Sequence, residues 1–360
     1  MTKQSQYTKP NFNEDIFKSA PDAVLAVAAA DGIVPPDFHA TSIFPEYIKI
    51  AGEWKLIELS RMDCCVVVKN GKPYAIEQRN VKRGDSVVIG RKDDATLGIF
   101  LYSTGFAAKH EKFDDFAFRT SRTRETAFSM DYDSLYDILK YEKQHGNIVW
   151  VLGPAVAFDY DSRNAMQLLI ENGYVDHVFA GNALATHDIE ASYLKTALGQ
   201  NVYTQEVMYN GHYNHLQTIN DVRESGSIKA FMSDHNITEG IMYALESGDI
   251  GYTLAGSIRD DGPLPEVIAD VYKAQTKMRS VISGATTVIG LATQLHTIAT
   301  GNMTPSYVVS GGKVRSVNFY AVDITEFAVN KLRDRGSLAI TSIVTNVQDF
   351  LVHLKHGLGL

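Results

Sequence analysis

The segment Phe179-Ala-Gly-Asn-Ala-Leu-Ala-Thr-His-Asp-Ile-Glu190 passes from an apolar run through a turn of small residues into a predicted helix. The run over residues 175–180 has the composition of a buried strand. Four polar side chains crowd around Gly181, which is where a parallel sheet would place its ligand. The order strand, glycine turn, helix therefore predicts half of a nucleotide and substrate site. We expect residues 256–265 (Gly-Ser-Ile-Arg-Asp-Asp-Gly-Pro-Leu-Pro) to supply the other half.

The same alternation continues on both sides of this segment, from about residue 130 to the end of the chain. Apolar strand-like runs alternate with amphipathic helical ones, which is typical of βαβ units and a parallel sheet with helices on both faces. The fold class predicted for residues 129–360 is therefore α/β, with a mostly parallel, doubly wound sheet. The predicted strands are 147–152, 175–180, 252–255, 317–322 and 338–344, with an apolar segment at 281–295; the predicted helices are 132–145, 162–172, 240–247, 266–278, 326–333 and 347–355.

Residues 1–128 have a different pattern of apolar and turn residues. They are predicted to form a smaller β-rich domain, a small barrel or sandwich. Short runs with β propensity (46–50, 54–59, 63–68, 73–77, 86–90 and 97–103) are separated by turn residues. Asn70-Gly71, between two of these runs, is a strong hairpin signal. Residues 21–30 are apolar and are consistent with either a short helix or a strand.

The composition excludes several classes of protein. The formal charge of −8 argues against a nucleic-acid partner. The only cysteines, Cys64 and Cys65, are adjacent, so we expect them on opposite faces of one strand, without a disulfide or a structural zinc site. His212 and His215 resemble metal-ligand spacing only loosely, and no metal is expected. No apolar run is long enough to span a bilayer, and the N-terminus has no signal core, so we expect a cytoplasmic protein with no membrane partner.

Polar or small residues follow the predicted strands at Gly153-Pro154, Gly181-Asn182, Gly256-Ser257, Asp323 and Thr345-Asn346. Glycines let the backbone approach a phosphate, and helix N-termini supply amide donors. The usual dinucleotide fingerprint, Gly-x-Gly-x-x-Gly after a strand, is absent, so a dinucleotide would need a different set of loops.

Each of these pieces also has a plainer interpretation. Gly153-Pro154 could simply end a strand, and Asp323 could cap a helix. The pair His187-Asp188 could do the same, whereas residues 259–262 could form a solvent loop. Residues 61–63 (Arg-Met-Asp) could hold a surface ion pair. Their joint placement at strand ends is what favours a site.

Several long motifs together resemble the archaeal-type ornithine cyclodeaminases, the LOR/SDH conserved-domain family. These motifs cover residues 30–41, 61–63, 173–199, 226–228, 239–243, 255–265, 295–303, 334–337 and 343–345. The resemblance implies an NAD-dependent enzyme whose catalytic domain is a Rossmann variant similar to deoxyhypusine synthase, and it implies a homo-oligomer, a dimer or tetramer. The chain departs from the family pattern at Ala157-Phe158-Asp159, where a His-Thr pair would be usual, and at Asn346, where an Asp would be.

The implied reaction converts L-ornithine to L-proline and ammonia: NAD takes the α-hydride, the δ-amine attacks the resulting imine, ammonia leaves, and the hydride returns. Asp188 or Asp261 could be the base, His187 or His296 could carry the proton, and Arg259 or Arg61 could bind the carboxylate. Asp63 and Asp159, with Arg61, are the predicted substrate-binding residues. The predicted cofactor-binding residues are Gly153, Pro154, Gly181, Asn182, Ala183, Gly256, Ser257, Asp260, Asn302, Met303, Asp323, Thr345 and Asn346. Two alternatives stay open, another amino-acid dehydrogenase of the opine or saccharopine type and a non-catalytic NAD-binding module.

Overall fold

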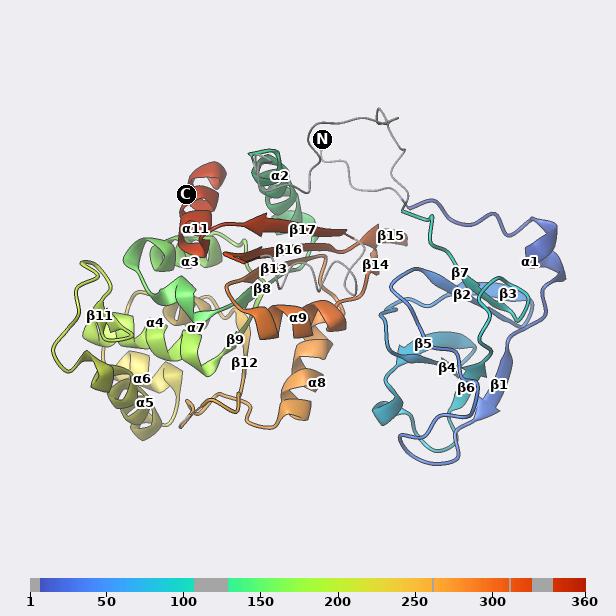
Figure 1. The fold of residues 1–360 in the computed structure, drawn as a ribbon, viewed down its shortest axis with the longest axis horizontal. Helices are drawn as coiled ribbons and strands as arrows, with labels where there is room; N and C mark the ends of the chain where they lie inside the picture. Colours follow the sequence, from blue (N-terminus) through green and yellow to red (C-terminus); the bar gives the residue numbers. More distant parts are fainter. Residues whose placement is uncertain (1–6, 107–128, 261, 311, 326–338) are drawn as a thin grey trace.

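The computed structural model describes residues 7–106, 129–260, 262–310, 312–325 and 339–360. A β-rich part and a larger α/β part lie side by side (Figure 1). They are joined by Tyr307, whose hydroxyl donates to the carbonyl of Ile57, and by the ion pair between Arg279 and Glu77. The predicted boundary at residue 128 borders the undescribed residues 107–128 and stays a prediction.

Two antiparallel sheets form the β-rich part, with strand orders β1-β6-β4-β5 and β3-β2-β7. Strands β4 and β5 are joined by Asn70-Gly71, both with positive φ (51° and 70°), which confirms the predicted hairpin. Ile48, Val66 and Val88 belong to one core that both sheets share, as in a sandwich. The strands are β1 (Val24–Val27), β2 (Glu46–Ile50), β3 (Glu53–Leu56), β4 (Cys65–Lys69), β5 (Lys72–Ile76), β6 (Ser86–Ile89) and β7 (Ile99–Leu101), with one helical turn, α1 (Asp15–Ser19), before them.

The α/β part is built on a six-stranded parallel sheet in the order β12-β9-β8-β13-β16-β17. Counted along the chain, this is the order 3-2-1-4-5-6 of a Rossmann fold, whose switch point lies between β8 and β13. The predicted doubly wound parallel sheet is thus confirmed. The strands are β8 (Ile148–Leu152), β9 (His177–Gly181), β12 (Gly251–Ala255), β13 (Thr287–Leu291), β16 (Asn318–Asp323) and β17 (Ala339–Val344).

Helices cover both faces of this sheet because its strands are apolar on both sides. In β8, Ile148, Trp150 and Leu152 face one core, whereas Val149 and Val151 face the other. The first core is covered by α2 (Ser129–His145), α3 (Tyr160–Glu171), α4 (Asn182–Leu194), α7 (Ile241–Ser247) and α11 (Val347–Leu358); the second is covered by α8 (Val271–Ile282) and α9 (Gln294–Met303).

The structure differs from the prediction at several elements. Residues 21–30 contain strand β1 and no helix. The helix predicted from residue 266 begins at Val271, because the Asp270 side chain accepts from the amides of Tyr272 and Lys273 while Ile268 pairs with β12. The helix predicted at 326–333 lies outside the described residues. Elements not predicted are α1, α9, β10 (Thr196–Ala197), β11 (Gln200–Asn201), α5 (Asn214–Ser225), α6 (Ile228–Asp234), β14 (Tyr307–Ser310) and β15 (Lys313–Ser316). The apolar segment 281–295 contains strand β13.

Among the described helices, none has both the length and the apolar character that crossing a bilayer requires. Over the same residues, no group of three or more His, Cys, Asp or Glu side chains is arranged to hold a metal ion.

Candidate functional site

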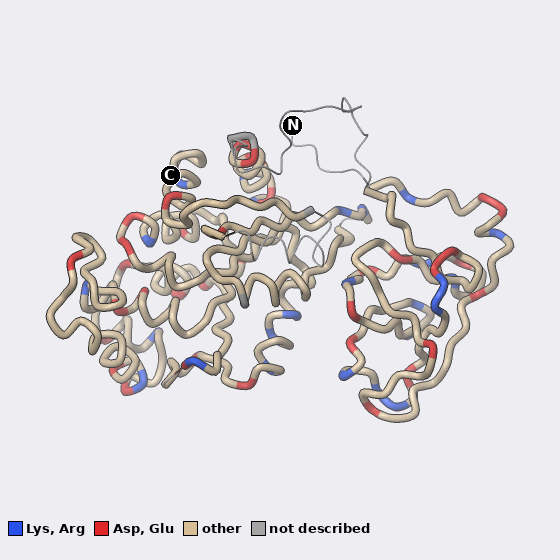
Figure 2. The backbone as a smooth tube through the Cα atoms, in the orientation of Figure 1, with Lys and Arg blue, Asp and Glu red and all other residues tan. Residues whose placement is uncertain are grey.

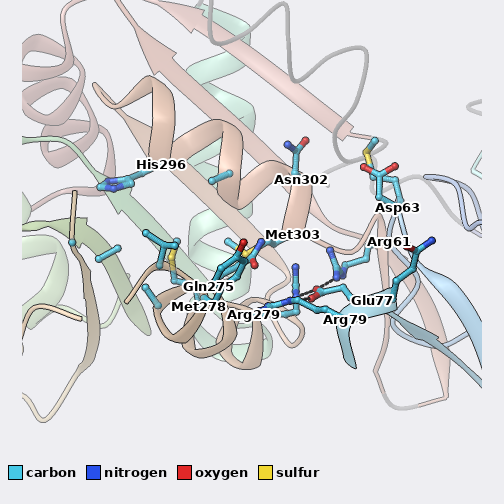
Figure 3. Close-up of a pocket in the computed structure, with 18 residues that line it drawn as sticks. Arg61, Asp63, Glu77, Arg79, Gln275, Met278, Arg279, His296, Asn302 and Met303 are labelled. Carbon is cyan, nitrogen blue, oxygen red and sulfur yellow. Dashed lines mark hydrogen bonds and ion pairs between the residues drawn. The ribbon is translucent and has the colours of Figure 1, made fainter. Parts of the chain in front are cut away.

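A cavity of about 760 Å³ lies where the β-rich part meets the α/β part. The β-rich part contributes residues 61–63 and 77–79, and the α/β part contributes the end of β12 and the facing sides of α8 and α9 (Figure 3). Six predicted site residues meet in this cavity although they are far apart in sequence: Arg61, Asp63, Gly256, His296, Asn302 and Met303.

Glu77 is the centre of a charged cluster at one end of the cavity. Its carboxylate accepts from Arg61 and from Arg79 Nε at 2.8 Å, and it forms an ion pair with Arg279. The guanidinium of Arg79 also lies over the ring of Tyr272, 5.3 Å from its centroid. Helix α8 thereby contacts the β-rich part through two cationic side chains.

Three guanidinium groups share the single carboxylate of Glu77, so the cluster carries an excess of positive charge. Nε of Arg279 has no hydrogen-bond partner in the part of the chain that the structure describes. A planar guanidinium with free N–H groups is the side chain best suited to bind a carboxylate. This end of the cavity can therefore accept an anionic group.

Asp63 supplies the opposite charge on the same wall. Its φ of 62° is in the left-handed region, which L-residues other than Asn and Asp rarely adopt. Its side chain lines the cavity beside Arg61 (Figure 3). A carboxylate next to an excess of guanidinium groups makes the wall bipolar, as an amino-acid ligand with a second amine requires.

His296 lies at the other end of the cavity, on α9 (Figure 3). Burial lowers its pKa below 6.5, and the negative charge of Asp260 raises it in part. The imidazole is therefore mostly neutral near pH 7 and can accept a proton. A methyl group placed on Gly181 would lie 3.0 Å from Cε1 of His296, so the histidine sits directly over the end of β9.

The residues at the carboxyl edge of the sheet fit a dinucleotide. Helix α4 starts at Asn182 and α9 at Gln294, and neither has a side-chain cap, so their first amides can donate to a phosphate. Ala183 is exposed in the first turn of α4. At the switch point the backbone of Gly153 contacts β13, and an added Cβ would lie 2.0 Å from the carbonyl oxygen of Ala292. Pro154 then begins a short 3₁₀ turn.

Several predicted cofactor residues at this edge make local hydrogen bonds. Asn182 Oδ1 accepts from the amide of Leu264 at 3.0 Å, which fixes the loop after β12 against α4. In that loop the amide of Ser257 donates to Asp260. Asn346 caps α11, and Asp323 accepts from the amide of Thr325 at 3.0 Å, so each makes a local hydrogen bond within its own loop. The amide of Thr345 donates to the carbonyl of Asp323.

Asp188 is fully buried, and each of its carboxylate oxygens has a protein partner. Oδ1 accepts from Arg163 Nε at 2.7 Å and from the amide of Ile241, and Oδ2 accepts from the amide of Met242. The carboxylate therefore holds the N-terminus of α7 against α3, and it does not line the cavity.

His187 belongs to a second buried network. Its Nδ1 lies 2.8 Å from Glu190, whose other oxygen accepts from the hydroxyl of Thr196. Asn214 donates to the same hydroxyl. This network ties α4 to β10 and α5 and also lies outside the cavity.

Two other predicted residues are not brought to the cavity. Arg259 is exposed in the loop after β12, and Asp159 caps α3 by accepting from the amide of Ser162 at 3.0 Å. Asp261 lies outside the described residues.

Five residues that line the cavity are absent from the predicted site residues, namely Glu77, Arg79, Tyr272, Gln275 and Arg279. Tyr272, Gln275 and Arg279 recur at spacings of three and four, so they share one face of α8, and correct helix bounds would have revealed that face. No local pattern marks Glu77 and Arg79, because their partners on α8 lie about 200 positions away.

Known proteins are similar to most of this chain. Residues 135–354 match the family model described as arginine dihydrolase ArgZ-like, C-terminal, Rossmann fold, and residues 45–119 match the first region of the same C-terminal part. The ornithine cyclodeaminase of Archaeoglobus fulgidus is 39% identical over 91% of this chain and 76% of its own length. That of Methanocaldococcus jannaschii is 38% identical, over 93% and 77%.

Two solved structures are similar over nearly all of the chain. A conserved LOR/SDH protein from Methanococcus maripaludis has a TM-score of 0.85 and 34% identity, covering 94% of this chain and 98% of the other. The complex of AgrE with ornithine and NAD+ has a TM-score of 0.58 and 32% identity, covering 94% of this chain and 46% of AgrE.

Proposed function

The chain belongs to the ornithine cyclodeaminase family, and from that premise we propose that its cavity converts L-ornithine to L-proline and ammonia with NAD. The predicted family, enzyme class and cofactor agree with the curated relatives and with the ornithine and NAD+ complex of AgrE. The roles of individual residues are our proposal.

The observation that carries the proposal is the bipolar cavity, with an excess of guanidinium groups, a carboxylate and a neutral imidazole along its length. Ornithine carries one carboxylate and two amines. Arg61 and Arg279 are suited to the α-carboxylate, because both already present guanidinium groups to the single carboxylate of Glu77. Asp63 is suited to the δ-ammonium group.

His296 is the proposed proton carrier, because it alone among the predicted acid–base candidates placed by the structure lines the cavity. Its lowered pKa keeps it neutral, so it can take a proton from the α-ammonium group of the substrate. The same imidazole can return that proton to the leaving ammonia. Asp188 and His187 are assigned to holding α4, α7 and β10 in place.

NAD, when bound, would supply a hydride acceptor for the α-carbon of the substrate and then the hydride that reduces the cyclic imine to proline. The residues proposed to hold it are Gly181, Asn182 and Ala183 at the start of α4, Gly256 after β12, and Gly153 at the switch point. This assignment is supported by the N-terminus of α4, which has no side-chain cap and lies at the carboxyl edge of a sheet with the Rossmann strand order. A cytoplasmic location and a homo-oligomeric state complete the proposal.

Incubation of the purified protein with L-ornithine, without added reductant, tests this function. We expect proline and ammonia in equal amounts and no net NADH. Accumulation of NADH with ornithine or another amino acid would identify an ordinary dehydrogenase instead. A thermal shift with NAD but no turnover of any amino acid would identify a non-catalytic NAD-binding module.

A further inference from the structure

An arm of the α/β part, residues 196–216, extends away from the β-rich part at the β10–β11 end of the molecule (Figure 1). Seven large apolar side chains of the arm are exposed: Leu198, Tyr203, Val207, Met208, Tyr209, Tyr213 and Leu216. Tyr160, beside the arm, is an eighth. Val207 is 80% exposed and Tyr209 is 95% exposed, so their side chains have almost no cover within the described chain.

The arm is an ordered structure that holds these side chains in fixed places. The amide of Met208 donates to Gly199 at 2.9 Å, and that of Asn201 donates to Glu206 at 2.9 Å. Gly211 packs so closely on Gly199 that an added Cβ would lie 2.5 Å from the oxygen of Gly199.

Beneath the arm, Phe158 packs with Ala191, Ala197 and Val202 in a small core. The rings of Tyr160 and Tyr203 lie 5.0 Å apart. These contacts fix the arm to α3 and α4, so ordering it costs little further entropy when a partner binds.

The area of the patch is appropriate for a stable interface. An aromatic side chain buries about 150–250 Å² when it is covered. Four of the eight side chains are tyrosines, so these alone offer an area on the order of the 800 Å² that each partner contributes to a standard interface. An exposed apolar area of that size, gathered on one arm, is typical of a protein interaction site.

The charge of the arm favours a second copy of the same chain as the occupant. Glu206 is the single Asp, Glu, Lys or Arg among residues 196–216, in a chain whose formal charge is −8. The tube of Figure 2 is accordingly tan over almost the whole arm, whereas charged residues are spread over the rest of the molecule. Two such arms can meet across a two-fold axis with little like-charge repulsion, as an isologous interface requires.

We propose that the arm, with Tyr160, is the surface through which two copies of this chain pair. The pairing is independent of the proposed chemistry, because the arm does not line the cavity between the β-rich part and the α/β part. The mass of the assembly in solution therefore tests the pairing, whereas turnover of ornithine tests the function.

The experiment compares the wild type with the double variant Val207→Glu/Tyr209→Glu by sedimentation velocity over a wide range of protein concentration. We expect the wild type to sediment as an assembly of at least two 39.8 kDa chains. The double variant should bind its second copy more weakly, since hot spots dominate such interfaces. The concentration at which half of the assembly has dissociated should be about a hundredfold higher than for the wild type. Both positions are so exposed that folding is not at stake.

Val27→Glu is the matched control, because Val27 is 66% exposed on edge strand β1, which is another exposed apolar surface. It should leave the assembly unchanged. A monomeric wild type, an assembly that survives the double variant, or one that Val27→Glu dissociates would each overturn the proposal.

Oxidative footprinting of the wild type gives a test without substitution. Tyr203, Tyr209 and Tyr213 should become protected as the concentration rises. Tyr74 and Tyr141, which are 43% and 42% exposed elsewhere, should not. Equal reactivity of the arm tyrosines at all concentrations would contradict pairing through the arm.

Discussion

The imidazole of His296 lies over Gly181, the residue that ends β9, so closely that a methyl group there would come within 3.0 Å of Cε1. One residue comes from α9 and the other from the strand before α4. Their contact joins the proposed proton carrier to the proposed phosphate-binding turn. The absence of a side chain at position 181 therefore sets where the imidazole can sit.

Gly181→Ala tests this contact. The backbone at 181 has φ of −100°, which alanine adopts without strain, so the expected effect is displacement of the imidazole. We expect kcat to fall about tenfold, or ~1.4 kcal/mol of transition-state stabilisation, with little change in melting temperature. Gly284→Ala is the control, because its added Cβ would make only ordinary contacts, the nearest at 3.6 Å. Equal kinetics for the two variants would remove His296 from the rate-determining chemistry.

His296→Gln should lower kcat by about a hundredfold or more, the range of general acid–base catalysis. NAD binding should persist, since the helix N-termini are untouched. Steady-state kinetics and a thermal shift with NAD measure the two effects separately. His353→Gln, an exposed histidine on α11, serves as the control. A kcat for His296→Gln within threefold of the wild type would contradict the assignment.

The pH dependence follows from the sign of the shift at His296. The imidazole accepts a proton only when neutral, and burial lowers its pKa below 6.5. The acid limb of kcat/KM should therefore lie below pH 6.5, with activity lost as the pH falls through the lowered pKa. Asp260→Asn removes the charge that partly raises this pKa, so the limb should move to still lower pH. A limb that stays in place or moves to higher pH would contradict the pairing of these residues.

Asp63→Asn removes a charge while keeping the backbone, because asparagine also adopts the left-handed conformation. If Asp63 binds the δ-ammonium group, KM for ornithine should rise at least tenfold. Asp37→Asn is a closely matched control, since Asp37 has φ of 59° and pairs with Arg91 at the surface. A similar KM for both variants would place the ammonium group elsewhere.

Arg279→Lys and Arg61→Lys keep the positive charge but lose the planar fork. Each should raise KM for ornithine about tenfold, because a bidentate contact to the carboxylate becomes a single one. Arg91→Lys, at an exposed ion pair, should be neutral. Unchanged KM in both cavity variants would show that the carboxylate is bound by other groups.

Asp188→Asn separates a structural role from a chemical one. The buried carboxylate pairs with Arg163 and caps α7, and breaking such a pair costs roughly 3–5 kcal/mol of unfolding free energy. We expect a large fall in stability to denaturant, with near-normal kcat in the fraction that remains folded. Normal stability with lost turnover would instead restore Asp188 as the base.

The parts of the fold that local patterns specify could be predicted. The alternation of buried strands and amphipathic helices after residue 130 gave the parallel sheet, and Asn70-Gly71 gave a hairpin. The start of α8 could not be predicted from Glu266 onward, because the Asp270 cap and the pairing of Ile268 with β12 outweigh helix propensity there.

The candidate site was harder to predict because it is assembled from distant segments. Gly181 and Gly256 were found at strand ends, but Glu77 reaches Arg279 only through the packing of one part of the chain on the other. Asp188 shows the converse. Its crowded neighbourhood suggested chemistry, whereas its partners 25 and 53 positions away give it a structural role.

The most direct test of the central claim is turnover of L-ornithine labelled with deuterium at the α-carbon and ¹⁵N at the δ-amine, without added reductant. Hydride removal and return within one site predicts proline that retains both labels and ammonia that carries no ¹⁵N. Proline that has lost the deuterium to solvent, ¹⁵N in the ammonia, or NADH accumulating in place of proline would contradict it.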